Sequence, residues 1–507
     1  MDKYVSIQLD RSSSKPLYAQ VYEDMVHLIK EGKLAPGEKL PPIRKLASML
    51  GVNTVTIINA YRLLEREGYA VSRVGSGTYV RPAGSAVDEE GIKVEGDGTG
   101  KTPDPGEDSA FAAGTAQPGG GRSQKIDFDF AGASVSPEYF PVKIFKEALN
   151  RVLDREGGYA FVYSESPGYL PFRQSLGEYL AREYGIEAPV DSIHVVSGAQ
   201  QGIDIISKAF LDFGDVVYVE SPTYPGAIDA FKSRGARIVE VPMAQDGIDL
   251  EDLHAKLRSK PPKLFYTMPN FQNPTGRSYS EQKKKELLAL SHKYDFLIVE
   301  DDHMNDLYYV EKPVPLKTLD GDGRVFYIKS FSKHFMPGLR LGFIVAPARF
   351  SKKIAEVKYF SDITSSGLTQ RALDVMLRDG TFCEHMKKLR GLFREKWDLM
   401  RQALKKHMHP GISWTEPQGG LFFWATLPDG YYSMNLYSKA LRRGLIITAG
   451  DFFYPDRLPS PCFRLSIAQV PADKLEEGIK LLSGIVSEML EEFGVYSVRN
   501  NRYQPLL

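Results

Sequence analysis

The order of apolar and polar residues divides the chain into a helical head and a long body of alternating strands and helices. In the head, apolar residues recur at helical spacing over 16–30, 43–50 and about 53–67, and breaker-rich loops separate the three stretches. Two helices joined by a tight glycine turn are typical of a helix-turn-helix. Two β-runs around a Gly-Ser-Gly turn follow at 69–80 and predict a wing-like hairpin.

Farther along the chain, the pattern predicts a mainly parallel sheet wrapped by helices, because apolar strands alternate with helical stretches. The run 296–299 is continuously apolar, as strands buried on both faces are, and 264–267 indicates a further apolar strand. The run 324–329 alternates and carries β-branched and aromatic residues, which indicates another short strand. From about residue 370 we expect a smaller C-terminal part, with a ligand between it and the larger part. The fold class expected for the body is α/β.

The segment between the two parts, residues 82–125, is rich in Gly, Pro, Ser and Asp and has few aromatic residues. It carries eight acidic and four basic residues, a balance of −4. Such a composition cannot bury enough apolar surface to fold, so we predict a flexible linker. The expected organisation is therefore a head at 1–81, a linker at 82–125 and a body at 126–507.

The charge balance differs between the parts. The whole chain has 64 basic and 64 acidic residues, whereas residues 1–81 have twelve basic and eight acidic ones, an excess of +4. This modest basic bias suits contacts with the phosphates of double-stranded DNA. In a helix-turn-helix, the second helix would enter the major groove, where its first residues reach base edges.

Cysteine content and hydropathy narrow the class of protein. The two cysteines, Cys383 and Cys462, argue against a disulfide framework and for a reducing compartment. The nine histidines are scattered, and we expect no metal site. The chain has no apolar run of eighteen residues, and its N-terminus has no apolar signal core. We therefore expect a cytoplasmic protein without a membrane partner.

A lysine with candidate chemistry, Lys333, follows the predicted strand 324–329 and is flanked by the hydroxyls of Ser330 and Ser332. A lysine held in a cleft can lose its proton and form a Schiff base with a carbonyl. Arg340 lies seven residues farther on, and an arginine with nearby hydroxyls suits a phosphate. A lysine imine beside a phosphate site suggests pyridoxal phosphate (PLP). Taken alone, the motif fits a surface lysine in a loop better, so other signals must decide.

Acidic residues follow the predicted strand 296–299. This order places Asp301 at the C-terminal edge of the sheet, where open α/β sheets bind ligands. A carboxylate there can keep the pyridine nitrogen of PLP protonated, so that the ring accepts electrons. Solvated acids at a strand end explain the pattern equally well.

Two turns supply further signals. After the strand 264–267, the sequence Asn-Pro-Thr-Gly at 273–276 would let the Asn273 amide donate to the phenolic oxygen of the ring. The segment 195–206 is a strand, a small-residue turn and an apolar helix start, which is the layout of a phosphate site at a helix N-terminus. Ordinary turns are the alternative in both places.

Together and in this order, the segments resemble the fold-type-I PLP enzymes, the aspartate-aminotransferase-like group, over about residues 126–490. The resemblance implies a large α/β domain, a small C-terminal α+β domain and a homodimer with its site at the subunit boundary. It implies three catalytic residues: Lys333 as the imine lysine, Asp301 as the partner of the pyridine nitrogen and Asn273 as the donor to the ring oxygen.

The same resemblance implies the other binding residues. Tyr224, in a Pro-rich turn, is similar to the aromatic residue that stacks on the ring, and Arg464 to the arginine that grips a substrate carboxylate with a two-pronged bond. Tyr163 is similar to the tyrosine that reaches the phosphate of a neighbouring subunit, although a core tyrosine explains it about as well. The implied phosphate contacts are Ala199, Gln200, Ser330 and Arg340.

One position departs from the family pattern. Many relatives carry a tyrosine near Asp301 that also bonds the ring oxygen, and the nearest residues here are His303 and Met304. We count His303 among the cofactor residues because a histidine can donate the same bond, but its proton is less certain near neutral pH. The departure leaves cofactor binding in place and speaks against fast turnover.

The head resembles the winged helix-turn-helix of GntR-family regulators through residues 40–61 and the turn at 75–78. The resemblance implies DNA contacts from Arg44, Thr56 and Gly77. A GntR-like head on an aminotransferase-like body is the MocR arrangement, which the whole chain resembles.

Two functions follow from this combination. The leading hypothesis is a transcription regulator that senses an amino compound through PLP: the amine displaces Lys333, its carboxylate pairs with Arg464, and the closed body biases two heads on paired DNA half-sites. The alternative is an active PLP-dependent aminotransferase of amino acids with a secondary DNA-binding head. A body that only dimerises would not explain the order of the motifs.

Overall fold

The structure is a computed structural model with two compact units, Met1–Pro103 and Asp104–Leu507. Each unit is described separately. The predicted linker at 82–125 lies outside the described residues. The described residues are 2–4, 7, 9, 17–50, 52, 56–57, 60–61, 63–64, 69–73, 77–80 and 126–500.

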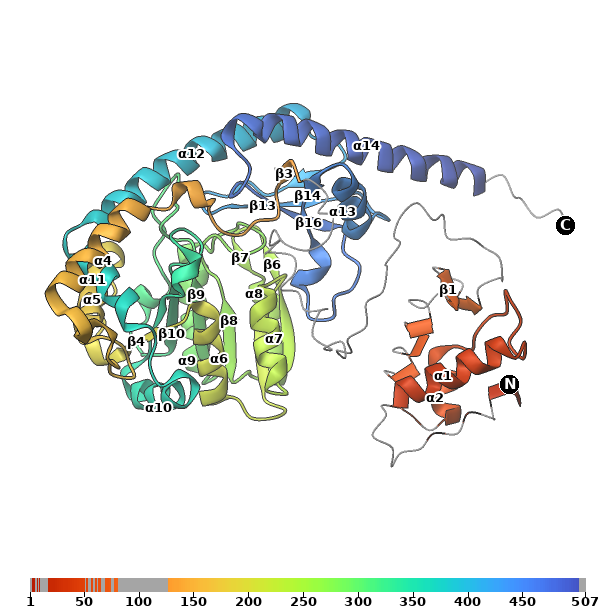
Figure 1. Cartoon of the computed structure of the whole chain (residues 1–507), viewed down its shortest axis with the longest axis horizontal. Coiled ribbons are helices and arrows are strands. Elements are labelled where there is room, and N and C mark those ends of the chain that lie inside the picture. Colours follow the sequence, from red (N-terminus) through yellow and green to blue (C-terminus); the bar gives the residue numbers. More distant parts are fainter. Residues whose placement is uncertain are drawn as a thin grey trace. The chain divides into compact units, whose positions relative to one another are not determined.

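The first unit has the predicted helices and hairpin (Figure 1, red). Helix α1 spans Leu17–Lys30, and α2 spans Ile43–Leu50. Strand β1, Ala70–Arg73, pairs antiparallel with β2, Gly77–Val80, which confirms the wing-like hairpin. The hydrophobic core of this unit is formed by apolar residues that recur every three or four positions along its helices. These buried residues include Val21, Met25 and Leu28 of α1, and Ile57, Ala60, Tyr61 and Leu64 of the third helical stretch.

The second unit contains an eight-stranded sheet that is mainly parallel, as predicted. Strand β11 runs antiparallel to both of its neighbours and β7 antiparallel to β6, while the other pairs are parallel. In sheet order the strands are β4 (Ile193–Val196), β11 (Gly342–Val345), β10 (Val325–Ser330), β9 (Leu297–Asp302), β8 (Leu264–Thr267), β5 (Val216–Ser221), β6 (Arg237–Ala244) and β7 (Gly247–Ile248).

Helices cover both faces of this sheet (Figure 1). Successive strand residues belong to different cores: Val299 packs with α6, α7 and α10, whereas Ile298 packs with α8 and α9. This alternation is what a strand buried on both faces requires. The helices of the larger part are α4 (Val142–Glu156), α5 (Leu170–Tyr184), α6 (Ala199–Phe210), α7 (Pro225–Ser233), α8 (Leu250–Ser259), α9 (Glu281–Lys293), α10 (Ser351–Asp362) and α11 (Gly367–Arg378).

The smaller C-terminal part has its own four-stranded sheet and three helices. The main chain of Arg464 lies between those of Trp424 and Thr448 in that sheet. A separate short pair joins β3 (Phe128–Asp129) to β14 (Leu445–Ile446). The sheet contains β12 (Ser413–Trp414), β13 (Phe422–Thr426), β16 (Cys462–Ser466) and β15 (Thr448–Ala449), and the helices are α12 (Thr381–His407), α13 (Ser433–Arg442) and α14 (Leu475–Asn500).

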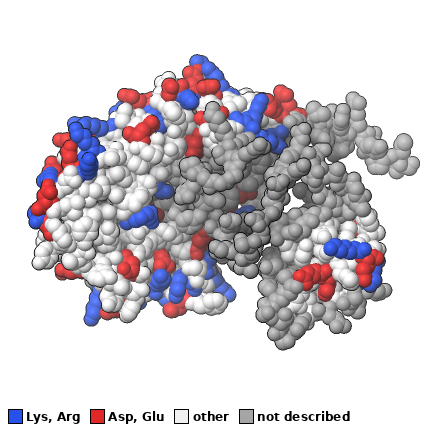
Figure 2. Space-filling view, viewed as in Figure 1, with Lys and Arg blue, Asp and Glu red and all other residues white. Residues whose placement is uncertain are grey.

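The surface of the body is mixed in charge. On the face drawn in Figure 2, positive and negative side chains are interspersed and do not gather into one patch of a single sign. Among the described residues, no helix has both the length and the apolarity needed to cross a bilayer. Within the same residues, no three His, Cys, Asp or Glu side chains are grouped so as to bind a metal ion.

Candidate cofactor site

Three neighbouring parallel strands deliver the predicted catalytic residues to one edge of the large sheet. Strand β9 ends with Asp301 and Asp302, β10 ends at Ser330 just before the loop that carries Lys333, and β8 leads into the turn that carries Asn273. The ladders β8–β9 and β9–β10 are parallel, so these C-terminal ends lie at the same edge. This is the edge at which open α/β sheets bind ligands.

The two carboxylate oxygens of Asp301 differ in their partners among the described residues. The Tyr266 hydroxyl donates a 2.7 Å hydrogen bond to Oδ2, whereas Oδ1 is buried and has no partner among the described residues. Burial raises the pKa of Asp301 to about 6, although the Tyr266 hydrogen bond acts to lower it. A buried, unpaired oxygen is costly unless a donor meets it. The protonated pyridine nitrogen of PLP is such a donor, so this residue fits the cofactor.

Lys333 is less basic than an ordinary lysine. Burial lowers its pKa to about 8, the cations Arg464 and Arg340 add to this effect, and Asp301 opposes it. At pH 7 about one in ten such amines is neutral, compared with about one in several thousand for an exposed lysine. The side chain thus carries the free amine that attack on a carbonyl requires.

The expected phosphate residues meet at the start of α6. Ala199 and Gln200 are its first two residues, after Gly198, whose φ of 87° is in the region that favours glycine. The Arg340 Nη2 donates a 2.6 Å hydrogen bond to the Ser197 carbonyl, and a Cβ at Gly198 would lie 3.0 Å from Nη2. A cation therefore lies beside a helix N-terminus, which is an arrangement that binds anions. The remaining expected residue, Ser330, is buried at the end of β10.

Arg464 lies directly beside Asn273. Its Nη1 donates a 2.8 Å hydrogen bond to Asn273 Oδ1, and its Nη2 donates one of 2.8 Å to the Ala131 carbonyl. The guanidinium also lies 4.3 Å from the ring centre of Phe422. Burial lowers the pKa of Arg464 to about 9, so it remains a cation at neutral pH. Because the Asn273 oxygen accepts from Arg464, its amide nitrogen is left as the donor.

Tyr224 directly precedes α7 and lies near Asp301. Burial raises its pKa to about 12, and the negative charge of Asp301 acts in the same direction. Gln200 Nε2 donates a 2.8 Å hydrogen bond to the Gly226 carbonyl, and a Cβ at Gly226 would lie 2.6 Å from the Tyr224 ring. A side chain at Gly226 would therefore displace two residues of the site at once.

Two further predicted cofactor residues differ in burial: His303 is buried, whereas Tyr163 is exposed. Burial lowers the pKa of His303 to about 3, so its ring is neutral at neutral pH, and the ring lies 6.4 Å from that of Phe422. Tyr163 is 84 % exposed, so it does not belong to the core, which was the alternative that the sequence left open.

The predicted DNA contacts belong to the other unit. Arg44 is in α2, although its side chain lies outside the described residues. Thr56 is helical and partly exposed, and Gly77 is the first residue of β2. The expected roles of all three stay predictions.

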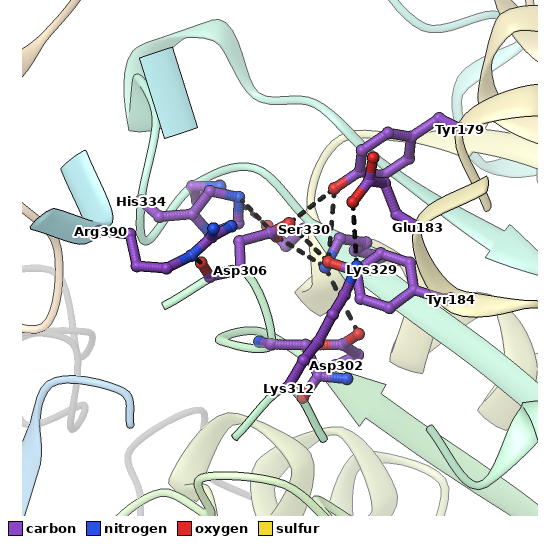
Figure 3. A network of polar contacts seen from close by, with 12 residues as sticks. Tyr179, Glu183, Tyr184, Asp302, Asp306, Lys312, Lys329, Ser330, His334 and Arg390 are labelled. Carbon is purple, nitrogen blue, oxygen red and sulfur yellow. Dashed lines mark hydrogen bonds and ion pairs between the residues drawn. The ribbon is translucent and has the colours of Figure 1, made fainter. Parts of the chain in front are cut away.

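A set of ionisable and hydroxyl groups beside the site was not expected from the sequence. The sequence does contain a hint of this set, because Lys329 is a charged residue within the apolar run of β10 and Asp302 follows Asp301. The set also includes Asp306, His334, Tyr179 and Tyr184 (Figure 3).

Comparisons with known proteins identify both parts of the chain. Residues 135–482 match the family aminotransferase class I and II, and residues 17–80 match the gntR family of bacterial regulatory proteins. The uncharacterized HTH-type transcriptional regulator YdfD of Bacillus subtilis is 32% identical over 481 residues, which are 92% of this chain and 96% of YdfD. The probable rhizopine catabolism regulatory protein MocR of Rhizobium meliloti is 29% identical over 94% of each chain.

A solved aminotransferase has the same fold as the body. LysN, the alpha-aminoadipate aminotransferase of Thermus thermophilus complexed with N-(5'-phosphopyridoxyl)-L-leucine, is 33% identical with a TM-score of 0.68. The match covers 72% of this chain and 93% of LysN. The chain therefore belongs to the aminotransferase class I and II family, and its body is joined to a GntR-family head in the arrangement of MocR-type transcription regulators.

Proposed function

We propose that the protein is a PLP-dependent, DNA-binding transcription regulator that senses an amino compound through its aminotransferase-like body. One observation carries the cofactor part of the proposal: Asp301 keeps a buried oxygen without a partner among the described residues, close enough to Lys333 for the two charges to influence each other. The GntR-family head in the same chain supports the regulatory part.

The residues of the site divide into distinct roles. When bound, PLP supplies an aldehyde that bonds to amines and a ring that accepts electrons. Lys333 supplies the neutral amine, Asp301 accepts the hydrogen bond of the ring nitrogen, and the Asn273 amide donates to the ring oxygen. The phosphate is expected at Ala199, Gln200, Ser330 and Arg340, the ring against Tyr224, and His303 close by as a neutral group.

Arg464 is the proposed partner of the amino compound's carboxylate. Of its five donor hydrogens, described residues occupy three, through Asn273, the Ala131 carbonyl and the Thr448 hydroxyl. The two remaining donors and the positive charge suit a carboxylate. Because Arg464 comes from the smaller part and Lys333 from the larger part, one ligand would contact both parts.

A second copy of the chain is the proposed partner of the body. Aromatic and apolar side chains are exposed around Tyr163 and at the end of α10, and the two segments meet where Thr364 Oγ1 lies 3.4 Å from the Glu165 carbonyl. Single exposed apolar residues are common on protein surfaces, whereas a contiguous apolar patch of this kind is typical of an interface. It supports a homodimer in which Tyr163 reaches the neighbour's phosphate. The exposed residues are Tyr159, Phe161, Val162, Tyr163, Tyr359, Phe360 and Ile363.

The oligomeric state of the protein can be measured by sedimentation velocity. The wild-type protein is expected to sediment as a dimer, and Phe161→Asp, which puts a charge into the patch, as a monomer. A monomeric wild-type protein would remove the proposed partner.

The regulatory proposal is tested by footprinting on the DNA upstream of the gene. In the wild-type protein, PLP together with members of an amino-acid panel should change the footprint. Lys333→Ala should still bind DNA, because the head is unaltered, but should give one footprint under all conditions. Lys352→Ala, which removes an exposed lysine of α10, is the matched control and should respond like the wild type. Identical wild-type footprints with every ligand would refute sensing.

A second candidate function is an active aminotransferase. The 33% identity with LysN and the complete set of expected residues favour it. The protein would then convert bound PLP to its amino form with an amino donor and restore it with a keto acid. Absence of this exchange across a broad panel of donors would exclude the second candidate and leave the first intact.

A further inference from the structure

A second set of ionisable side chains occupies the ends of the same strands but has no role in the proposed cofactor site. Lys329 of β10 is fully buried, and its Nζ lies 2.8 Å from Asp306 Oδ2 and 3.4 Å from Asp302 Oδ2 (Figure 3). His334 Nε2 lies 3.2 Å from the same oxygen of Asp306. We call Lys329, Asp302, Asp306 and His334 the buried charge cluster.

Tyrosines complete the surroundings of its two carboxylates. Tyr179 and Tyr184 of α5 donate hydrogen bonds of 2.6 and 2.5 Å to Asp306 Oδ1. The Tyr327 hydroxyl donates to Asp302 Oδ2. The cluster therefore joins the end of β9, the loop after it, β10 and α5.

The charges of the cluster depend on one another. Burial acts to lower the pKa of Lys329, but Asp302 and Asp306 together raise it above its ordinary value. Burial acts to raise the pKa of Asp306, but the Lys329 ammonium brings it well below its usual range. Burial lowers the pKa of His334, so the histidine is neutral at neutral pH. One cation is thus shared by two buried anions.

The cluster is adjacent to the cofactor site along the chain. Asp302 follows Asp301 in β9, and His334 follows Lys333 in the loop after β10. Lys329 is the register partner of Asp302 in the parallel ladder. Because successive strand side chains point to opposite faces, Asp302 points away from Asp301. The ion pairs therefore hold the two strand ends from the far side of the cofactor site.

Stability alone does not account for such a cluster. Apolar residues of similar volume commonly stabilise a core as well as a buried ion pair does, or better. What the charges add is a penalty for displacement, since a shift of one strand end separates opposite charges in a low-dielectric interior.

We propose that Lys329 is a positioning residue for the cofactor site. The proposal rests on the proposed binding of PLP. The ion pairs of Lys329 with Asp302 and Asp306 keep Asp301 and Lys333 at the separation at which both act on one cofactor, Asp301 at the ring nitrogen and Lys333 at the aldehyde.

The test compares two buried lysines in the full-length protein. Lys329→Met removes the cluster's cation, and the matched control Lys358→Met removes a buried lysine whose Nζ lies 2.7 Å from Asp362 in α10. Both variants are expected to lower the thermal midpoint of the PLP-free protein. Only Lys329→Met should raise the dissociation constant of PLP, by about tenfold or more, because small misplacements of reacting groups have large effects. Only it should move the pH midpoint of the visible absorbance of bound PLP.

A variant of smaller effect keeps the proposal testable if Lys329→Met does not fold. Asp306→Asn preserves the shape of the side chain and leaves Lys329 with Asp302, so weaker PLP binding in the same direction is expected. Unchanged PLP affinity and pH midpoint in the folded cluster variants would overturn the positioning role while the wild-type protein still binds PLP. A wild-type protein that binds no PLP would overturn the proposed function, and the positioning role with it.

Discussion

Lys329 and Lys333 are four residues apart, and their environments give the same side chain opposite properties. Lys329 lies between two carboxylates, which raise its pKa. Lys333 lies near the cations Arg464 and Arg340, and burial lowers its pKa to about 8. The first lysine is therefore fixed as a cation, whereas the second can release its proton. Burial acts to lower the pKa of both lysines, so the opposite directions of their shifts come from their charged neighbours.

The two neighbouring carboxylates differ in the same way. Asp306 has a cation and two tyrosine hydroxyls as partners, and its pKa is lowered. Asp301 has one tyrosine as a partner and, within the part of the chain that the structure describes, none for its other oxygen, and its pKa is raised. Asp306 has an ion pair with Lys329 and two hydroxyl donors, whereas one oxygen of Asp301 has no partner among the described residues and is left to a ligand. Binding sites commonly carry such unmet interactions, and the surrounding structure must hold them in place.

The largest expected effect is a complete difference between the two lysines in their reaction with PLP. If the wild-type protein is loaded with PLP and treated with borohydride, peptide mapping should find the pyridoxyl group on Lys333 and none on Lys329. The reason is that attack requires a neutral amine, and the ion pairs of Lys329 keep it protonated. Lys333→Ala is the control, and it should give no adduct at either position. An adduct on Lys329 would end the contrast between the two lysines.

Much of the fold was accessible from the sequence because it follows local rules. The period of apolar residues predicted the helices of the head, and the apolar run at 296–299 predicted β9. The site was accessible only in part. Lys333 and Asp301 stand next to predicted strands. The contact of Arg464 with Asn273 joins residues 191 positions apart and was not expected, because the family resemblance implied a separate role for each of the two residues.

The buried charge cluster shows what the sequence could not provide. Lys329 is conspicuous in an apolar strand, but a lysine there predicts no particular partner. The partners of Asp306 include Tyr179, which is 127 residues away in α5, and hydrophobic periodicity does not specify which helix packs on which strand end. The neutral state of His303 likewise follows from burial, which depends on the packing of Phe422 and other distant residues.

The smaller effect concerns stability and contrasts Asp301 with Asp306. The pKa of Asp301 in the folded protein is about 6, compared with an ordinary value of 3.8. Because the pKa is raised, the carboxyl group of Asp301 contributes favourably to the free energy of unfolding below about pH 4. This contribution is lost as the pH rises through 6. Asp301→Asn removes this titration. Relative to the wild type, PLP-free Asp301→Asn should therefore gain about 2 to 3 kcal/mol in free energy of unfolding between pH 4 and pH 8.

Asp306→Asn should show the opposite sign. The lowered pKa of Asp306 stabilises the fold above the ordinary carboxyl pKa, and this contribution is lost as the pH falls, so the variant should lose most stability relative to the wild type at pH 8. Urea denaturation followed by tryptophan fluorescence measures both, because Trp397, Trp414 and Trp424 all belong to the body and report on it alone. Equal pH dependence in the two variants would mean that the pKa values of Asp301 and Asp306 are not shifted in opposite directions as the structure indicates.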